Sequence, residues 1–240
     1  MDAPVKKTEA DRAVGRALPH DSAHLHVSGQ AAYTDDLPEP RDLLHVAIGM
    51  STRPHARLLK LDLDAVRAAD GVVDTLVAGD IPGDNNFGPI VADDPILVDG
   101  IVEYVGHPVF AVAASTVNAA RKACALAAID YEDLEPILDV ADAVERESFV
   151  LPTETLERGE PRKRLDAAAH RLSGRTSCGG QDQFYLEGHI AMAQPQEDGA
   201  LVVYSSTQHP DEIQGLVAHA TGRSAKDVVV ICRRMGGAFG

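Results

Sequence analysis

Apolar positions in the first 145 residues fall into short runs, whose lengths are typical of β-strands rather than of long helices. The predicted strands cover residues 43–50, 51–63, 72–77, 109–113 and 127–131. The first, Leu-Leu-His-Val-Ala-Ile-Gly-Met, is apolar at nearly every position, which predicts a buried strand. The second carries alternating apolar residues, Leu59, Leu61 and Leu63.

Single helices separate these strands. Asp64 stands where a short helix would have its N-cap, and Ser115 or Thr116 where an alanine-rich helix over 117–126 would have its own. Residues 79–95 are rich in Gly, Pro, Asp and Asn, which predicts a long surface loop. Strands and single helices without a repeated unit predict an α+β domain.

The second part of the chain repeats this mixture. Strands are predicted around 189–194 and 201–205, and a helix begins at Pro210 and ends at Gly222. Residues 228–232 form a continuous, mostly β-branched run, which predicts a strand buried on both faces.

Four segments follow from these patterns. Residues 1–17 are polar and aperiodic, typical of a flexible arm, and residues 18–145 form the first domain. The highly charged stretch 146–170 is interpreted as a connector. Residues 171–240 begin a second domain, which we expect to be truncated because a glycine-rich turn directly follows its last strand.

The composition excludes several classes of partner. A formal net charge of −15 and a pI of about 4.9 describe a surface that repels phosphate backbones and anionic lipid, so neither nucleic acid nor membrane is expected. The N-terminus lacks the apolar core of a signal peptide, and the three cysteines are too widely spaced for a disulfide framework. We therefore expect a cytoplasmic protein, with Cys124, Cys178 and Cys232 as small buried thiols.

Three short segments are unusual for a plain core. In residues 179–181, Gly-Gly-Gln, a neutral amide stands beside a backbone that can approach a bulky group. Residues 205–210, Ser-Ser-Thr-Gln-His-Pro, form a polar cluster where a strand ends and a helix starts. In residues 236–240, Gly-Gly-Ala-Phe-Gly, the glycines let the backbone pass a ligand and Phe239 offers an apolar wall. Singly, each is better explained as a turn, and the glycine spacing of a dinucleotide site is absent.

Together, the three segments resemble the xanthine dehydrogenase and aldehyde oxidase family. The matching stretches are 179–187 (Gly-Gly-Gln-Asp-Gln-Phe-Tyr-Leu-Glu), 205–214 (Ser-Ser-Thr-Gln-His-Pro-Asp-Glu-Ile-Gln) and 233–240 (Arg-Arg-Met-Gly-Gly-Ala-Phe-Gly). They stand in the order and spacing of that family.

The resemblance extends upstream. Residues 18–22 (Leu-Pro-His-Asp-Ser) and 29–38 (Gly-Gln-Ala-Ala-Tyr-Thr-Asp-Asp-Leu-Pro) are similar to the opening of the family's hammerhead domain. Residues 104–109 (Tyr-Val-Gly-His-Pro-Val) resemble that domain's Gly-Gln-Pro-Val, with His107 in place of the glutamine. The resemblance implies an α+β hammerhead domain followed by the start of a molybdenum-cofactor-binding domain.

What the resemblance implies chemically is a molybdenum hydroxylase. In that family a pyranopterin holds molybdenum, and a glutamate base assists the transfer of oxygen from water to an electron-poor carbon. By resemblance, Gln181 donates an amide hydrogen bond to an oxo ligand of molybdenum, and Phe239 lies beside the metal and walls the substrate pocket. Gly180, Gly237 and Gly240 belong to the cofactor-binding loops. The catalytic base and the substrate arginine lie beyond residue 240, so no catalytic residue is expected within this chain, and the 240 residues alone are expected to be inactive.

The resemblance also implies partners. Electrons leave the metal through [2Fe–2S] clusters and FAD to NAD, and this chain shows no motif for either group. A second subunit or a further segment should therefore carry both, and a separate subunit, in a dimer of heterodimers, is favoured. The Ser-Ser-Thr-Gln-His-Pro stretch favours xanthine or hypoxanthine as the purine substrate. Two alternatives stay open: a hydroxylase of aldehydes or other N-heterocycles, and a non-catalytic module that docks a partner subunit.

Some other residues admit a chemical role that the sequence does not favour. They are His20, His24 and His26; His189, His209 and His219; Asp35 and Asp36; and Asp93 and Asp94. The histidines are disfavoured as metal ligands, and adjacent aspartates face different directions on an extended chain. Arg233 and Arg234 could neutralise a pterin phosphate, although an ion pair is favoured. Glu187, predicted to lie on a strand with Gln181, is interpreted as a structural partner rather than a general base.

Overall fold

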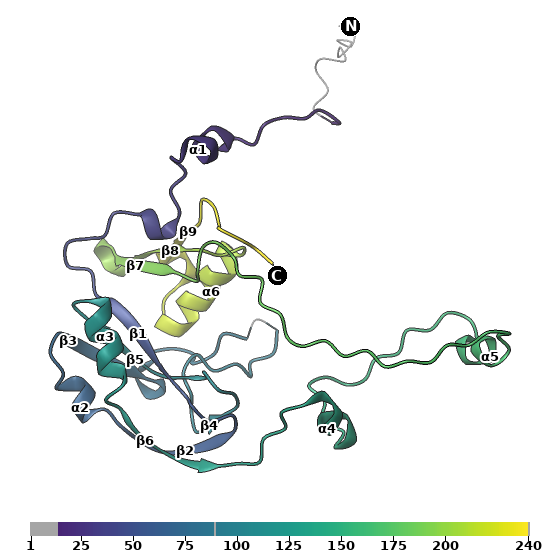
Figure 1. The fold of residues 1–240 in the computed structure, drawn as a ribbon. Helices are drawn as coiled ribbons and strands as arrows, with labels where there is room; N and C mark the ends of the chain where they lie inside the picture. Colours follow the sequence, from purple (N-terminus) through teal and green to yellow (C-terminus); the bar gives the residue numbers. More distant parts are fainter. Residues whose placement is uncertain (1–13, 89, 240) are drawn as a thin grey trace, which may run out of the picture.

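Two three-stranded antiparallel sheets form the first part of the chain in the computed structural model, which describes residues 14–88 and 90–239. The strands are β1 (His45–Met50), β2 (Ala56–Asp62), β3 (Val72–Val77), β4 (Ile101–Val102), β5 (Pro108–Ala114) and β6 (Ala128–Asp133). One sheet has the order β1-β5-β3 and the other β4-β2-β6 (Figure 1). The predicted strands are all present, and the α+β class is confirmed.

The central strand β5 contributes several residues to the hydrophobic core of the first part of the chain. Val109, Phe110 and Val112 of β5 are at most 1% exposed and pack with buried residues of both sheets. The expectation that residues 43–50 are buried was wrong, because only one face of β1 is covered: its alternate side chains, such as Val46 at 62% and Met50 at 56%, face solvent. A run of apolar residues does not reveal whether one face of the strand or both faces are covered by other elements.

A register shift interrupts β2 between Leu58 and Lys60. The alternation of leucines is broken there: Leu63 is 2% exposed, whereas Leu59 is 61% exposed. The bulge therefore turns Leu59 toward solvent.

Two helices, α2 (Asp64–Arg67) and α3 (Val117–Cys124), lie against the β1-β5-β3 sheet. The N-cap of α3 is Thr116, whose hydroxyl accepts a hydrogen bond from the amide of Ala119 at 3.1 Å, as predicted. Asp64 is the first residue of α2 rather than its N-cap, and its amide is capped instead by the carboxylate of Asp62 at 3.1 Å.

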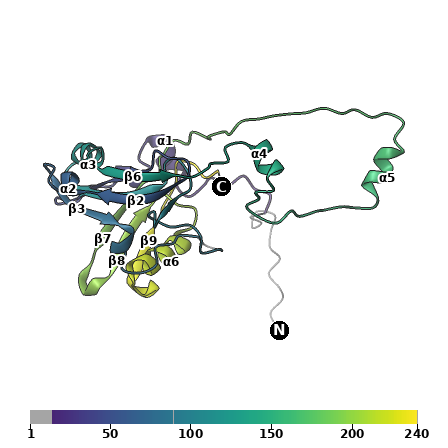
Figure 2. The ribbon, with the colours of Figure 1, turned by 90° about the horizontal axis from the view of Figure 1, so that it is seen from below.

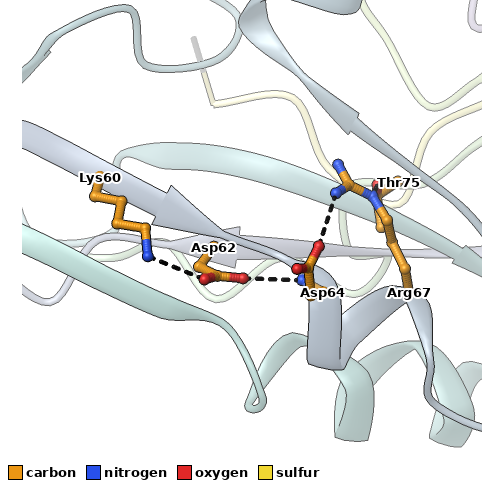
Figure 3. A network of polar contacts seen from close by, with 5 residues as sticks. All are labelled: Lys60, Asp62, Asp64, Arg67 and Thr75. Atoms are coloured by element: carbon orange, nitrogen blue, oxygen red, sulfur yellow. Dashed lines mark hydrogen bonds and ion pairs between the residues drawn. The ribbon is translucent and has the colours of Figure 1, made fainter.

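Figure 3 shows the polar network around the start of α2. Lys60 Nζ lies 3.1 Å from Asp62 Oδ2, and Arg67 reaches both Asp64 at 3.7 Å and the hydroxyl of Thr75 on β3 at 3.1 Å. The Asp64 amide and Lys60 hold the pKa of Asp62 below its usual value, and the hydrogen bond to Asp62 raises the pKa of Lys60. Lys60, Asp64 and Arg67 are exposed and Asp62 and Thr75 are half-buried, so the network positions α2 without much stabilising it.

The segment before β7 leaves the body of the molecule as a long excursion (Figures 1 and 2). It contains α4 (Val140–Glu145) and α5 (Pro161–Asp166), and every residue from 144 to 184 is exposed. The exposed stretch is thus longer than the predicted connector. The expected flexible arm lies mostly outside the described residues, and α1 (Ala23–Ser28) after it was not predicted.

A third sheet, of order β7-β8-β9, forms the second part. Its elements are β7 (Ala191–Pro195), β8 (Leu201–Ser205), α6 (Pro210–Thr221) and β9 (Val228–Ile231). The helix joins the parallel strands β8 and β9 and packs through Ala218 against Val203 and Val228. The predicted helix, from Pro210 to its Gly222 cap, is confirmed. The expectation that this last strand is buried on both faces was wrong, because only one face is covered: Val228 is fully buried, whereas Val229 on the opposite face is 50% exposed.

The two parts meet where the predicted surface loop 79–95 touches α6. The amide of Gly83 donates to the carbonyl of Ala220 at 3.0 Å, and that of Asp84 to the carbonyl of His219 at 3.1 Å. These carbonyls belong to the last turn of α6, where a helix lacks partners of its own. Residues 83–84 are therefore an interdomain contact, not merely surface.

Four short 3₁₀ turns complete the described chain. They are η2 (Thr34–Asp36), η3 (Ala78–Asp80), η4 (Glu197–Gly199) and η5 (Ala225–Asp227). Among the described residues, no helix is long and apolar enough to cross a membrane.

His107, which stands where the resemblance expects glutamine, is 1% exposed and lies just before β5. Its Nδ1 accepts a hydrogen bond from the amide of Glu103 at 3.3 Å, and its ring stacks on Tyr104 with the centroids 4.4 Å apart. Burial lowers the pKa of His107, although Glu103 and Asp94 oppose the shift. The imidazole is thus a neutral part of the core.

Candidate functional site

Three segments that are far apart in sequence line one pocket at the end of the third sheet. The pocket has a volume of about 320 Å³. Its lining comprises Gln183, Tyr185, Glu187 and His189; Ser206, Thr207, Gln208 and His209; and Met235, Gly237, Ala238 and Phe239. The segments singled out by sequence thus converge, although not through every residue expected.

The first wall, residues 183–190, has no regular secondary structure, so the expectation of a strand carrying Gln181 and Glu187 was wrong. This wall is fixed to the third by a backbone hydrogen bond, in which the amide of Leu186 donates to the carbonyl of Gly236 at 3.0 Å. A Cβ at Gly236 would collide with Glu187, and one at Gly237 would collide with Tyr185. Glycine is required at both positions because the two segments approach each other so closely.

Glu187 connects the first wall of the pocket both to the third wall, at Gly236, and to Thr34 in the first part of the chain. One carboxylate oxygen accepts from the amide of Gly236 at 3.0 Å, and the other accepts from the amide of Thr34 at 3.1 Å. The interpretation of Glu187 as a structural partner is confirmed, because both of its oxygens are engaged by backbone amides.

Tyr185 and His189 form a pair inside the pocket. The Tyr185 hydroxyl lies 2.8 Å from Nε2 of His189, and the rings stack with centroids 5.2 Å apart. The two residues are four positions apart on non-helical backbone, so no sequence periodicity could have revealed the pair.

The second wall is held by Ser206, directly after β8. Its hydroxyl accepts from the amide of Ile190 at 3.2 Å, and its own amide donates to the carbonyl of Ile190 at 3.1 Å. Beyond it, the amide of His209 donates to the Thr207 hydroxyl at 3.1 Å, immediately before α6 begins. The polar cluster therefore lies at a strand end and a helix start, as predicted.

Not all of the predicted site residues line the pocket. Gly180 and Gln181 are exposed on the last stretch of the excursion, two or more positions before Gln183, which does line it. Phe239 lines the pocket and is 60% exposed, and Gly237 stands beside it. Gly240 lies outside the described residues.

Among the described residues, Arg234 makes a backbone hydrogen bond in place of the favoured ion pair, and its contact with a pterin phosphate stays a prediction. Its Nη1 donates to the carbonyl oxygen of Ala32 at 2.5 Å, and its Nε is buried without a partner among the described residues. The side chain thus connects the third wall to the first part of the chain. The expectation of buried cysteines also fails in part, because Cys178 is exposed and Cys124 and Cys232 are half-buried.

Comparison with protein families agrees with this arrangement. A family model for the a/b hammerhead domain of aldehyde oxidase and xanthine dehydrogenase matches residues 28–135, and one for a molybdopterin cofactor-binding domain matches residues 143–240. The chain is a hammerhead domain followed by the start of a molybdopterin cofactor-binding domain. It belongs to the xanthine dehydrogenase and aldehyde oxidase family.

Individual relatives support this membership. Xanthine dehydrogenase/oxidase of Gallus gallus is 37% identical over 228 residues, which are 95% of this chain and 17% of that protein. Nicotinate hydroxylase of Emericella nidulans is 39% identical over 239 residues, which are 96% of this chain and 18% of that protein. The chain thus spans less than a fifth of the length of these two relatives.

Solved structures show the same fold. Quinoline 2-oxidoreductase from Pseudomonas putida superposes with a TM-score of 0.79 and 25% identity over 94% of this chain and 31% of that one. Aldehyde oxidoreductase from Desulfovibrio gigas superposes with a TM-score of 0.81 and 22% identity over 97% of this chain and 28% of that one.

Proposed function

We propose that the chain contributes to a molybdenum hydroxylase, and that the pocket between residues 183–190, 206–209 and 235–239 is part of its cofactor and substrate site. The observation that carries the proposal is the convergence of three segments, each matching the family in sequence, on one pocket of about 320 Å³. Domain boundaries at 18–145, 146–170 and 171–240 belong to the same proposal.

The side chains of the pocket suit a pyranopterin–molybdenum group. Gln183, Ser206, Thr207 and Gln208 are neutral hydrogen-bonding groups, which can stabilise oxygen ligands without repelling the metal. The carboxylate of Glu187 would repel an anionic group, but both of its oxygens are already occupied by backbone amides. The donor set therefore fits the group.

When bound, the cofactor would supply the oxidation and the oxygen transfer from water. This chain's own residues would bind and orient it. Gln181 would donate its amide to an oxygen ligand, and Phe239 would wall the substrate pocket and exclude water. Gly180, Gly237 and Gly240 would let the backbone approach. The catalytic base is not among the residues of this proposal.

We propose xanthine or hypoxanthine as the substrate, with the Ser206–His209 segment near it. A second candidate is another N-heterocycle, and the observation in its favour is the 39% identity with a nicotinate hydroxylase, beside 37% with the chicken xanthine dehydrogenase/oxidase. An aldehyde is a third candidate of the same chemistry.

We further propose that electrons pass to [2Fe–2S] clusters and FAD on a partner subunit, in a cytoplasmic hetero-oligomer. The natural protein, purified with the chains that accompany it, tests this. Metal analysis should find molybdenum, iron and flavin, and anaerobic xanthine should bleach the flavin spectrum faster than nicotinate or an aldehyde does. Faster bleaching by nicotinate would support the second candidate. A complex without molybdenum would instead support the docking module.

A further inference from the structure

We propose that Glu187 is a positioning residue, which couples the first part of the chain to the loop that forms the third wall of the pocket. The loop comprises residues 235–239, and the coupled segment, here called the N-terminal strap, comprises residues 32–36. Only the link from this coupling to catalysis rests on the proposed function.

The coupling depends first on the two hydrogen bonds of the Glu187 carboxylate. Each oxygen of Glu187 has its own backbone donor, Thr34 on one side at 3.1 Å and Gly236 on the other at 3.0 Å. The donors are 202 positions apart in sequence, and the carboxylate, with two acceptor oxygens and no donor, serves both. Hydrogen bonds to an ionised acceptor are also stronger than neutral ones.

The Thr34 amide has no acceptor within its own helical turn. Thr34 is the first residue of η2, and the first amides of a helical turn have no acceptor inside it. The neighbouring Tyr33 amide is satisfied locally by Asp36 Oδ2 at 2.9 Å. Glu187 thus supplies what the strap itself does not provide.

A second tie runs in parallel. Arg234, directly before the loop, donates from Nη1 to the carbonyl of Ala32 at 2.5 Å. The strap is therefore bound to the third wall at two points, through Glu187 and through Arg234, and a displacement of the strap would pull on both.

The coupling holds the loop of residues 235–239 in place. Gly236 has both its amide and its carbonyl bonded to residues 186–187, and Phe239 stands three positions further on, lining the pocket. The orientation of Phe239 depends on this anchor, because Phe239 is 60% exposed and has little burial of its own to fix it.

Thr34→Pro tests the coupling from the far side. Proline removes the amide hydrogen that Thr34 donates to Glu187. It is tolerated at the first position of a helical turn. It also requires an extended residue before it, and Tyr33 is extended, with φ −94° and ψ 179°. Thr34→Ala is the matched control, because it removes the side chain and keeps the amide. Neither substitution touches the loop directly.

The measurement is amide hydrogen exchange, by mass spectrometry, in peptides covering residues 32–37 and 233–239 of the natural protein with its accompanying chains. Glu187→Ala should accelerate exchange in both peptides by roughly tenfold, the scale of one hydrogen bond to a charged group. Thr34→Pro should accelerate exchange in the loop peptide by at least about twofold, and Thr34→Ala should match the parent. In the double variant Thr34→Pro/Glu187→Ala, amide exchange in the loop peptide should be no faster than in Glu187→Ala alone.

Loop exchange in Thr34→Pro equal to that in Thr34→Ala would overturn the proposal. If Thr34→Pro does not fold, Glu187→Ala decides, since unchanged exchange in the strap peptide would overturn the proposal equally. The readout needs no bound molybdenum. A parent protein without molybdenum or hydroxylase activity would contradict the proposed function while leaving the coupling test intact.

Discussion

The phenol oxygen of Tyr185 lies 2.8 Å from Nε2 of His189, and the two rings stack at an interplanar angle of 20°. The Tyr185 side chain also fills the space beside Gly237, where a Cβ would collide with it. One side chain therefore makes a polar contact within the first wall of the pocket and an apolar contact with the third.

Tyr185→Phe separates these two contacts. The Cβ that lies beside Gly237 stays, and only the hydroxyl is lost, so the free energy of unfolding should fall by about 0.5–1.5 kcal/mol. Urea denaturation measures this. In a double-mutant cycle with His189→Leu the losses should not add, and full additivity would show that the pair does not interact.

The close approach at Gly236 predicts a larger effect. Gly236→Ala places a methyl group against Glu187 and should destabilise the protein by about 1–3 kcal/mol, as overpacking does. Gly179→Ala is the control, because a Cβ at Gly179 meets nothing within 4 Å. Equal melting temperatures for the two variants would contradict the contact.

Gln181 and Gln183 can be told apart by mutation. If Gln181 donates to an oxygen ligand of molybdenum, Gln181→Ala should slow the reduction of the enzyme by substrate roughly a hundredfold and leave the fold intact. Gln181→Glu should be slower still, because a carboxylate would face an anionic oxygen. Rapid-reaction reduction measures both. A normal rate in Gln181→Ala with a slow rate in Gln183→Ala would transfer the role to Gln183, which lines the pocket.

His107 predicts a dependence of stability on pH. Burial lowers its pKa in the folded protein below the ordinary value of 6.5, so the unfolded chain binds the proton more tightly. The stabilisation is complete above about pH 6.5 and is lost as the pH falls through the lowered folded pKa. Protonation would also replace the Nδ1 lone pair that accepts from Glu103.

His107→Gln should weaken that dependence, because an amide accepts the same hydrogen bond without titrating. The free energy of unfolding should then change less between about pH 7.5 and about pH 5 than it does in the parent. Denaturant titrations at both values measure the change, with His24→Gln at an exposed position as the matched control. An undiminished change in His107→Gln would assign the acid sensitivity to other groups.

Local patterns predicted local elements well. Residues 72–77 and 201–205 are strands with the predicted bounds, and α6 begins at Pro210 and is capped by Gly222, because turn and cap residues act on their own neighbours. The strands β1 and β9 were mispredicted as fully buried, since the exposure of Val46 or Val229 depends on whether another layer covers that face of the sheet.

The candidate site was predictable as three segments but not as a set of contacts. Glycines and polar clusters mark where the backbone turns near other groups. They do not show that the amide of Thr34 reaches Glu187, or that Gln183 rather than Gln181 lines the pocket. Such contacts join residues far apart in the chain and depend on the complete fold.

The exposed excursion has a consequence for how the molecule holds together. Every residue from 144 to 184 is exposed, whereas residues 83–84, Thr34 and Ala32 bind the second part directly. A protease that cuts the excursion would sever the polypeptide but leave these contacts in place. The nicked halves should therefore migrate together under native conditions, and two separately synthesised pieces should reassemble.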